Sequence, residues 1–132
     1  MGMDMVVVFR TFDLAEAQVV RVKTSGTMDL DQIKQMMVDG LAEGARRGTS
    51  RFLVDHRDMT PVLQMADIYR LPDVSLAVGV DRRFQVAIVF SPDSESRQDF
   101  EFYEIRAHNF GYDHRLFTTP EAALHWLTGN PG

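Results

Sequence analysis

The chain has 132 residues, which fits a single domain spanning residues 1–132, and its shares of hydrophobic (45%) and charged (25%) residues are near globular averages. The net charge is −5 and there is no cysteine, which excludes disulfides, thiol catalysis and cysteine-bound metals. The acidic balance argues against nucleic-acid binding, since nucleic-acid binders usually present a basic face. No stretch approaches the roughly 20 apolar residues of a membrane span. We expect a cytoplasmic protein without stable membrane insertion.

Two β-rich runs open the chain, Met5–Phe12 and Gln18–Thr24, and the short connection Asp13–Glu16 predicts a hairpin. The next run, Asp29–Arg47, is the clearest helix, because Asp29 and Gln32 have the spacing of a capping box and Gly48 is a natural stop. Its apolar or small stripe indicates close packing against a sheet and consists of Ile33, Met36, Met37, Gly40, Leu41 and Gly44.

The stretch Arg51–Pro61 is the most informative part of the chain. Phe52–Val54 predicts a buried strand, and a polar cluster follows it. Thr60 and Pro61 suit a helix start, with the hydroxyl as cap and Pro in the first position, so we expect a helix over Pro61–Leu71. Its predicted core stripe is Val62, Met65, Ala66 and Tyr69, which leaves Leu63 and Ile68 off the stripe.

The second half of the chain continues the alternation. We expect a loop with a short extended piece over Pro72–Phe84, a central strand at Val86–Phe90, and a helix from a Ser96 cap to about Asn109. A short strand at Leu116-Phe117 and a helix opening at Thr118–Glu121 and running to Leu127 complete the order. The result is an α/β fold: an N-terminal hairpin, then alternating helices and strands, with a mixed five-stranded sheet and about four helices.

The polar cluster lies where a parallel strand ends, and that edge of an α/β sheet is where such folds usually bind ligands. It consists of Asp55, His56, Arg57 and Asp58. The carboxylates could act as acid, base or ligand and Arg57 as an anion clamp, or the group could be a solvated turn with mutual ion pairs. No accompanying nucleophile, phosphate-binding loop or metal-ligand histidine spacing is present, so we expect no catalysis, no metal and no cofactor.

Aromatic residues crowd the last third of the chain and could line an apolar pocket or form the core. They are Phe100, Phe102, Tyr103, Phe110, Tyr112, Phe117 and Trp126. A helical stripe of Phe100, Tyr103, Ala107 and Phe110 favours the core. Phe102 and Ile105 lie off that stripe.

The order and spacing of these segments resemble the SpoIIAA-like family of the STAS and CRAL-TRIO (Sec14-like) superfamily. The resemblance covers about Val19 to Leu127, and its most distinctive part is the ending from Phe117 through Glu121-Ala122 to Trp126-Leu127. It implies a small α/β sandwich that is usually not an enzyme. Related STAS domains act as phosphorylation-controlled regulators, and CRAL-TRIO relatives bind lipids in an apolar cavity. The regulators carry an Asp-Ser pair followed by small residues, where this chain has Asp58-Met59-Thr60-Pro61.

The sequence therefore favours two functions; a third, an enzyme, would require a pocket in which Asp55 or Asp58 converges with a histidine and has a perturbed pKa. The first is a regulatory or binding module that contacts a protein partner through Asp55, Arg57, Asp58 and Thr60, together with Leu63 and Ile68 on the next helix, with Thr60 as a candidate phosphoacceptor. The alternative is a carrier of a lipid or small apolar ligand, which needs an enclosed cavity of several hundred Å³ between helices and sheet. A homodimer through a sheet edge or an apolar helix face is a further expectation.

Overall fold

The computed structural model of the protein describes residues 6–14 and 17–129. Its elements in chain order are β1 (Val6–Leu14), β2 (Ala17–Met28), α1 (Leu30–Arg47), β3 (Arg51–Pro61), α2 (Met65–Val78), β4 (Gln85–Val89), α3 (Arg97–Asn109), β5 (Asp113–Phe117) and α4 (Pro120–Leu127). The prediction of an α/β fold is confirmed, with four helices in this part of the chain.

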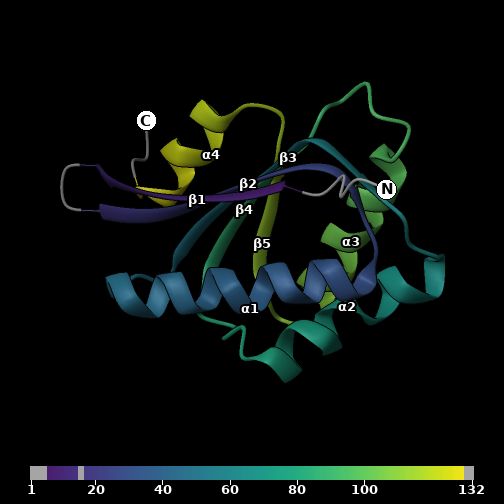
Figure 1. The fold of residues 1–132 in the computed structure, drawn as a ribbon, viewed down its shortest axis with the longest axis horizontal. Helices are drawn as coiled ribbons and strands as arrows, with labels where there is room; N and C mark the ends of the chain where they lie inside the picture. Colours follow the sequence, from purple (N-terminus) through teal and green to yellow (C-terminus); the bar gives the residue numbers. More distant parts are fainter. Residues whose placement is uncertain (1–5, 15–16, 130–132) are drawn as a thin grey trace.

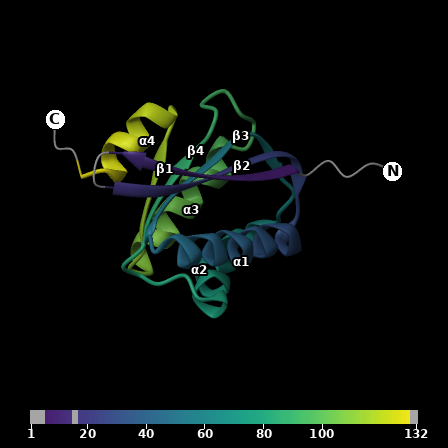
Figure 2. The same ribbon diagram turned by 60° about the vertical axis from the view of Figure 1, so that its left-hand side comes forward.

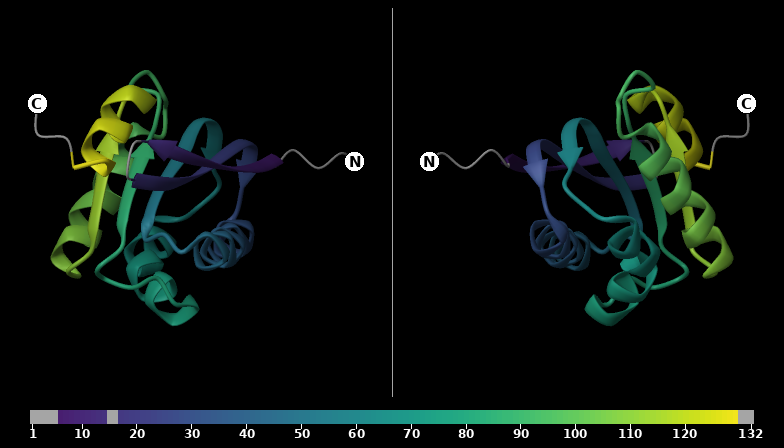
Figure 3. Two further views of the ribbon diagram at one scale, coloured as in Figure 1. Left: turned by 90° about the vertical axis from the view of Figure 1, so that its left-hand side faces the viewer. Right: turned by 90° about the vertical axis from the view of Figure 1, so that its right-hand side faces the viewer.

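The strands lie in the sheet in the order of the chain, β1-β2-β3-β4-β5. β2 to β5 are parallel to one another, and β1 pairs antiparallel with β2 in the long pair that Figure 2 shows. Since each parallel strand lies beside its predecessor and crossovers are right-handed, α1, α2 and α3 must cover the same face of the sheet. α4 follows the last strand and lies on the opposite face (Figures 1 and 3).

Each face of the sheet has its own core. The larger cluster joins alternate residues of β2, β3 and β4 to α1, α2 and α3, and includes Val22, Ile33, Met36, Phe52, Val54, Leu71, Ile88 and Phe100. The smaller one lies under α4 and consists of Val19, Leu53, Ala87, Val89, Ala123 and Leu127. The strict alternation of neighbours such as Leu53 and Val54 between the two clusters follows from the two-residue period of a strand.

The first helix forms as predicted. The Asp29 side chain accepts a hydrogen bond from the Gln32 backbone, the Gln32 side chain accepts one from the Asp29 backbone, and Gly48 ends the helix in the left-handed conformation. Gly40 and Gly44 are buried. A Cβ atom on Gly44 would lie 2.6 Å from the Phe52 ring, so the close packing against the sheet is confirmed.

The second helix differs from the prediction at both ends. Thr60 and Pro61 still belong to β3, and α2 begins at Met65 after an N-cap at Gln64. It then runs through Pro72 to Val78, where a loop was expected. A proline inside a helix removes one backbone hydrogen bond. Packing of the buried face formed by Ile68, Leu71, Pro72 and Ser75 offsets that loss.

The remaining differences are smaller. β1 extends to Leu14 and β2 to Met28, whereas Met5, Ala15 and Glu16 of the predicted hairpin lie outside the described residues. Ser96 is the N-cap of α3, but its side chain makes no capping hydrogen bond, so that part of the prediction is wrong. Thr119 caps α4 through the Ala122 backbone, as expected of a helix that opens with Thr and Pro.

Candidate functional site

The polar stretch after Val54 is a continuation of β3 and not a loop, which corrects the sequence prediction. Lys23 on β2 pairs with Asp55, but Ser25 pairs with Asp58, so His56 and Arg57 together face Thr24 in a β-bulge. β4 ends its pairing with β3 at Asp55. Beyond that point β3 pairs with β2 alone and reaches Pro61, in a β2–β3 ribbon that β1 borders as far as Ser25.

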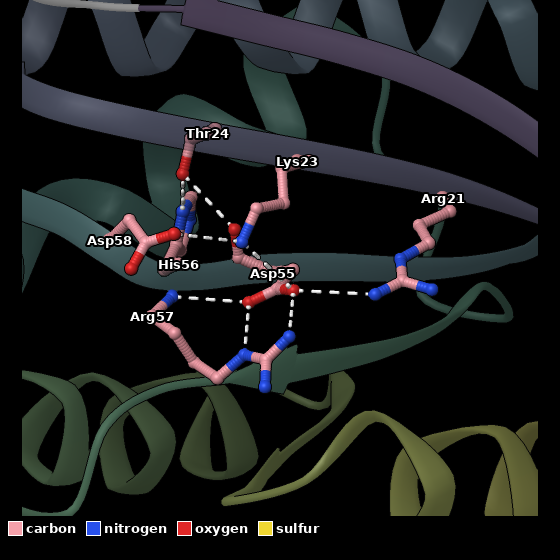
Figure 4. Close-up of polar contacts among 7 residues, drawn as sticks. All are labelled: Arg21, Lys23, Thr24, Asp55, His56, Arg57 and Asp58. Atoms are coloured by element: carbon pink, nitrogen blue, oxygen red, sulfur yellow. Dashed lines mark hydrogen bonds and ion pairs between the residues drawn. The ribbon is translucent and has the colours of Figure 1, made fainter.

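Around Asp55, three cations gather on the side of the sheet that faces α4 (Figure 4). The Arg57 side chain donates from Nε to Oδ1 of Asp55 at 2.9 Å and from Nη2 to Oδ2 at 2.8 Å. The Arg57 backbone N–H also donates to Oδ1, at 3.2 Å. Arg21 and Lys23 approach from β2, each at 3.4 Å. The Asp55 side chain is fully buried beneath them.

This arrangement fixes the charge of Asp55. Burial alone would raise the pKa of the carboxyl, but the hydrogen bonds from Arg57 and the charges of Lys23 and Arg57 outweigh burial and hold the pKa well below its usual range. An acid with so low a pKa is a weak proton acceptor near neutral pH. The geometry therefore supports a structural role, in which Asp55 holds the bulge and the two strands together.

Arg57, Asp58 and Thr60 lie together on the exposed side of the ribbon. Asp58 receives a hydrogen bond from Lys23 at 3.0 Å, and its side chain is 64% exposed. The three residues border a polar hollow of about 360 Å³, whose other side is the segment from Ser91 to Ser96 with Asp93 and Glu95. Thr60 is an exposed strand residue paired with Thr27 and not a helix cap, so its hydroxyl is accessible.

Leu63 and Ile68 were expected off the core stripe, and this expectation is wrong. Ile68 is buried at 2% exposure, and Leu63 is half-buried against the larger core cluster. The stripe assigned to the core is the exposed one, with Val62, Met65 and Tyr69 each more than half exposed. The spacing of Ile68, Leu71 and Ser75 at i, i+3 and i+7 indicates the buried face of α2. The prediction missed this pattern because it ended the helix at Leu71, and Ser75 lies beyond Pro72.

A partly open cavity of about 140 Å³ lies between the sheet and the three helices α1, α2 and α3. Most of its lining is apolar and comes from all three helices and from β2, β3 and β4, with Val22, Met36, Val54, Ile68, Ile88 and Phe100 among the contributors. Five polar residues also border it: His56, Ser75, Asp99, Tyr103 and His114. Ile68, one of the predicted contact residues, thus borders this cavity and is buried.

The two histidines reach the cavity from different strands. His56, the inward residue of the bulge, contacts the Thr24 hydroxyl through Nδ1 at 2.6 Å, and Thr24 donates to the Asp55 carbonyl at 3.3 Å. His114 on β5 contacts the Tyr103 hydroxyl through Nδ1 at 2.7 Å and stacks on Tyr112 with ring centroids 4.5 Å apart.

Both rings are neutral near pH 7. Burial lowers the pKa of His56 to about 4, against the raising effect of the Asp55 charge, and burial alone lowers the pKa of His114 to about 4. Burial also raises the pKa of Tyr103, which keeps the phenol protonated. The four histidines are far apart in the sequence, and nothing in it indicates that two of them border one cavity. His56 and His114 come to the same cavity because of the order of the strands in the sheet.

The aromatic residues of the last third belong largely to the core, as the helical stripe indicated. Phe100 and Ala107 are buried, and Tyr103 and Phe110 are partly buried against the core clusters. Phe102 is half-buried and Ile105 is 58% exposed. Phe100 and Tyr103 also border the cavity, so the two alternatives for this region are not exclusive.

Comparison with known proteins identifies the fold. No family model and no curated protein matches the chain. A solved structure at 2.25 Å resolution, an uncharacterized protein of the DUF3478 family with a SpoIIAA-like fold from Shewanella loihica PV-4, is similar over 96% of this chain and 98% of its own, with a TM-score of 0.64 and 18% sequence identity. The SpoIIAA-like fold is therefore shown. The CRAL-TRIO part of the resemblance finds no support in this comparison.

The described residues hold neither a membrane-spanning helix nor a cluster of metal ligands. None of the helices in the described part of the chain is both long enough and apolar enough to cross a bilayer. Within residues 18–129, no three His, Asp or Glu side chains lie together as metal ligands would.

Proposed function

We propose that this protein is a non-catalytic binding module and that its ligand is a small apolar molecule held in the cavity between the sheet and the three helices α1, α2 and α3. The observation that carries the proposal is the cavity itself, about 140 Å³ in volume and lined mainly by apolar side chains. Binding sites for small molecules are concave, mostly apolar and few in a protein. A cavity of this composition is therefore the first place to expect a ligand.

The volume also limits the ligand. An apolar cavity of about 150 Å³ engineered in another protein binds benzene and xenon. Cavities for drug-sized ligands measure roughly 300–1,000 Å³. At about 140 Å³, the site suits a single ring or a short chain better than a membrane lipid, so the ligand proposed here is smaller than the lipid that the sequence left open.

Benzene is a suitable first probe, measured by chemical-shift changes in the amide spectrum of the labelled protein. We expect saturable changes confined to residues around the cavity, and a rise in melting temperature with benzene concentration. Val54→Leu, which adds volume to a cavity-lining position, should weaken binding. Val89→Leu is the matched control, because Val89 lies on the same sheet in the cluster under α4. No saturable change in the wild-type protein would contradict the proposal.

A second candidate is contact with a protein partner through the exposed ribbon and the start of α2. The observation in its favour is the group of large apolar side chains that follows Thr60: Val62, Met65 and Tyr69, exposed by 58%, 59% and 54%. Native mass spectrometry of the protein isolated from its own cell would reveal a stoichiometric partner and the added mass of a phosphate, and fragmentation would show whether the phosphate is on Thr60. Met65→Ser should abolish the complex, and Val38→Ser, on an exposed position of α1, should not.

A further inference from the structure

One polar residue that borders the cavity, His114, is not explained by the proposed function alone. His114 lies on β5 with only 6% of its surface exposed, and it borders the cavity. Its Nδ1 atom is taken by the Tyr103 hydroxyl at 2.7 Å. Among the described residues, none offers a hydrogen-bond partner to its Nε2 atom, which is also buried. A buried polar atom without a partner is costly, and each one in a native structure calls for an explanation.

We infer that the ligand of this cavity is a neutral, ring-sized molecule with one hydroxyl group, of the phenol type, and that the hydroxyl bonds to Nε2 of His114. This inference rests on the proposed function, because it assigns the polar contact within the same cavity. The apolar walls hold the ring, and the single histidine nitrogen holds the polar group.

A hydroxyl group can bond to Nε2 whichever of the two ring nitrogens of His114 carries the proton. Neutral His114 has one N–H, at either Nδ1 or Nε2, and the Tyr103 hydroxyl can donate or accept accordingly. Nε2 is therefore either a donor or an acceptor, and a hydroxyl group can complement both forms. A carbonyl group could only accept, and a simple amine would be charged near neutral pH.

The charge of the lining excludes an anionic ligand such as a carboxylic acid in its ionised form. Among the described residues that border the cavity, none is lysine or arginine, and Asp99 supplies the one carboxylate. The two histidines that border it are neutral near pH 7 because they are buried. An anion would thus lose its hydration without gaining a cation in return.

The test compares phenol with benzene, which differ by the hydroxyl alone, using titration calorimetry and the amide spectrum of the labelled protein. Without a polar partner, phenol would bind more weakly than benzene, since its hydroxyl would lose water and gain nothing. We expect phenol to bind at least as tightly as benzene. We also expect the Nε2 resonance of His114, observed in a long-range proton–nitrogen spectrum, to shift with phenol and to stay in place with benzene.

The variant His114→Phe keeps a ring at this position and removes the nitrogen. We expect it to retain benzene binding and to weaken phenol binding relative to benzene by about tenfold or more. His108→Phe, on an exposed position of α3, is the control and should leave the ratio unchanged. If His114→Phe does not fold, the nitrogen spectrum of the wild-type protein decides the matter.

The outcomes separate the two proposals. Benzene binding with weaker phenol binding and no shift at Nε2 overturns the assignment of His114 and leaves the proposed function in place. Failure of both molecules to bind overturns the proposed function itself, and the ligand class with it. Equal weakening of both molecules in His114→Phe would show that the ring supports the cavity wall only, and would also overturn the assignment.

Discussion

The Asp55 carboxylate and the Arg57 guanidinium, two residues apart on the same strand, form a two-point ion pair at 2.9 and 2.8 Å. Residues i and i+2 of a strand share a face, so the two side chains can meet. Arg115 and Asp113 make a similar contact at 3.4 Å in β5. At Asp55 the pair spans the bulge opposite Thr24, where Arg57 also donates its backbone N–H to the carboxylate.

Asp55→Asn should destabilise the protein by about 2 kcal/mol or more, because it leaves Arg21, Lys23 and Arg57 around a buried group that no longer carries a charge. Urea unfolding followed by circular dichroism measures the change. Asp58→Asn is the control: Asp58 is 64% exposed and forms an exposed pair with Lys23, so the loss should stay within about 1 kcal/mol. Equal effects of the two variants would show that the buried cluster adds nothing specific.

Gly44→Ala should lower stability by about 1–3 kcal/mol, although alanine is the better helix former. The added methyl group would lie 2.6 Å from the Phe52 ring, and both residues are buried in the contact between α1 and the sheet. The melting temperature and the urea midpoint give the measurement. A gain in stability would show that the Phe52 ring can move aside.

Ala45→Gly tests the same helix at an exposed neighbouring position. It should also lower the free energy of unfolding, by about 1 kcal/mol. Here the cause is the lower helix propensity of glycine and not a change in packing. The two variants together separate the packing effect at Gly44 from the propensity effect that every position of the helix shares.

Local signals explain the parts of the fold that the sequence predicted. The Asp29 and Gln32 side chains meet their partners within one helical turn, so their spacing alone determines the start of α1. The same holds for Thr119 at the start of α4. Such contacts depend on residues three positions apart and need no knowledge of the fold.

The ribbon and the cavity depend on contacts between distant strands, and the sequence could not supply these. Asp55 to Pro61 form a strand because β2 pairs with them out to Met28, although their polar side chains resemble a loop. The helix signal of Thr60 and Pro61 was overridden by that pairing. The crevice that binds ligands at the carboxyl edge of an α/β sheet forms where the strand order reverses. Here the parallel strands β2 to β5 follow one another without reversal.

Tyr103→Phe should destabilise the protein by about 1–2 kcal/mol, because it removes the partner of His114 Nδ1 and leaves the buried ring without a hydrogen bond to a described side chain. Chemical denaturation measures the loss. Tyr69→Phe makes the same chemical change on a residue that is 54% exposed, and its stability should stay close to that of the wild type. An effect at Tyr103 no larger than at Tyr69 would contradict the assigned bond.

Stability should fall as the pH is lowered from about 6.5 to about 4, before any buried carboxylate is protonated. Burial lowers the pKa of His56 and of His114 from 6.5 to about 4, so in this interval the unfolded chain binds protons that the folded chain does not. Protons then favour unfolding, and stability is fully present only above the unfolded value. Each histidine contributes up to about 3 kcal/mol to the loss. Asp55, whose pKa is held low, adds its own loss only below its ordinary value of 3.8.

Urea unfolding at pH 7, 6, 5 and 4.5 measures this dependence. His114→Phe should remove about half of the loss between pH 6.5 and 4.5, because the remaining half belongs to His56. His108→Gln removes an exposed histidine from α3 and should leave the dependence as it is in the wild type. A wild-type protein equally stable at pH 7 and 4.5 would mean that the two buried rings take up protons in the folded state, through an opening of the cavity to water.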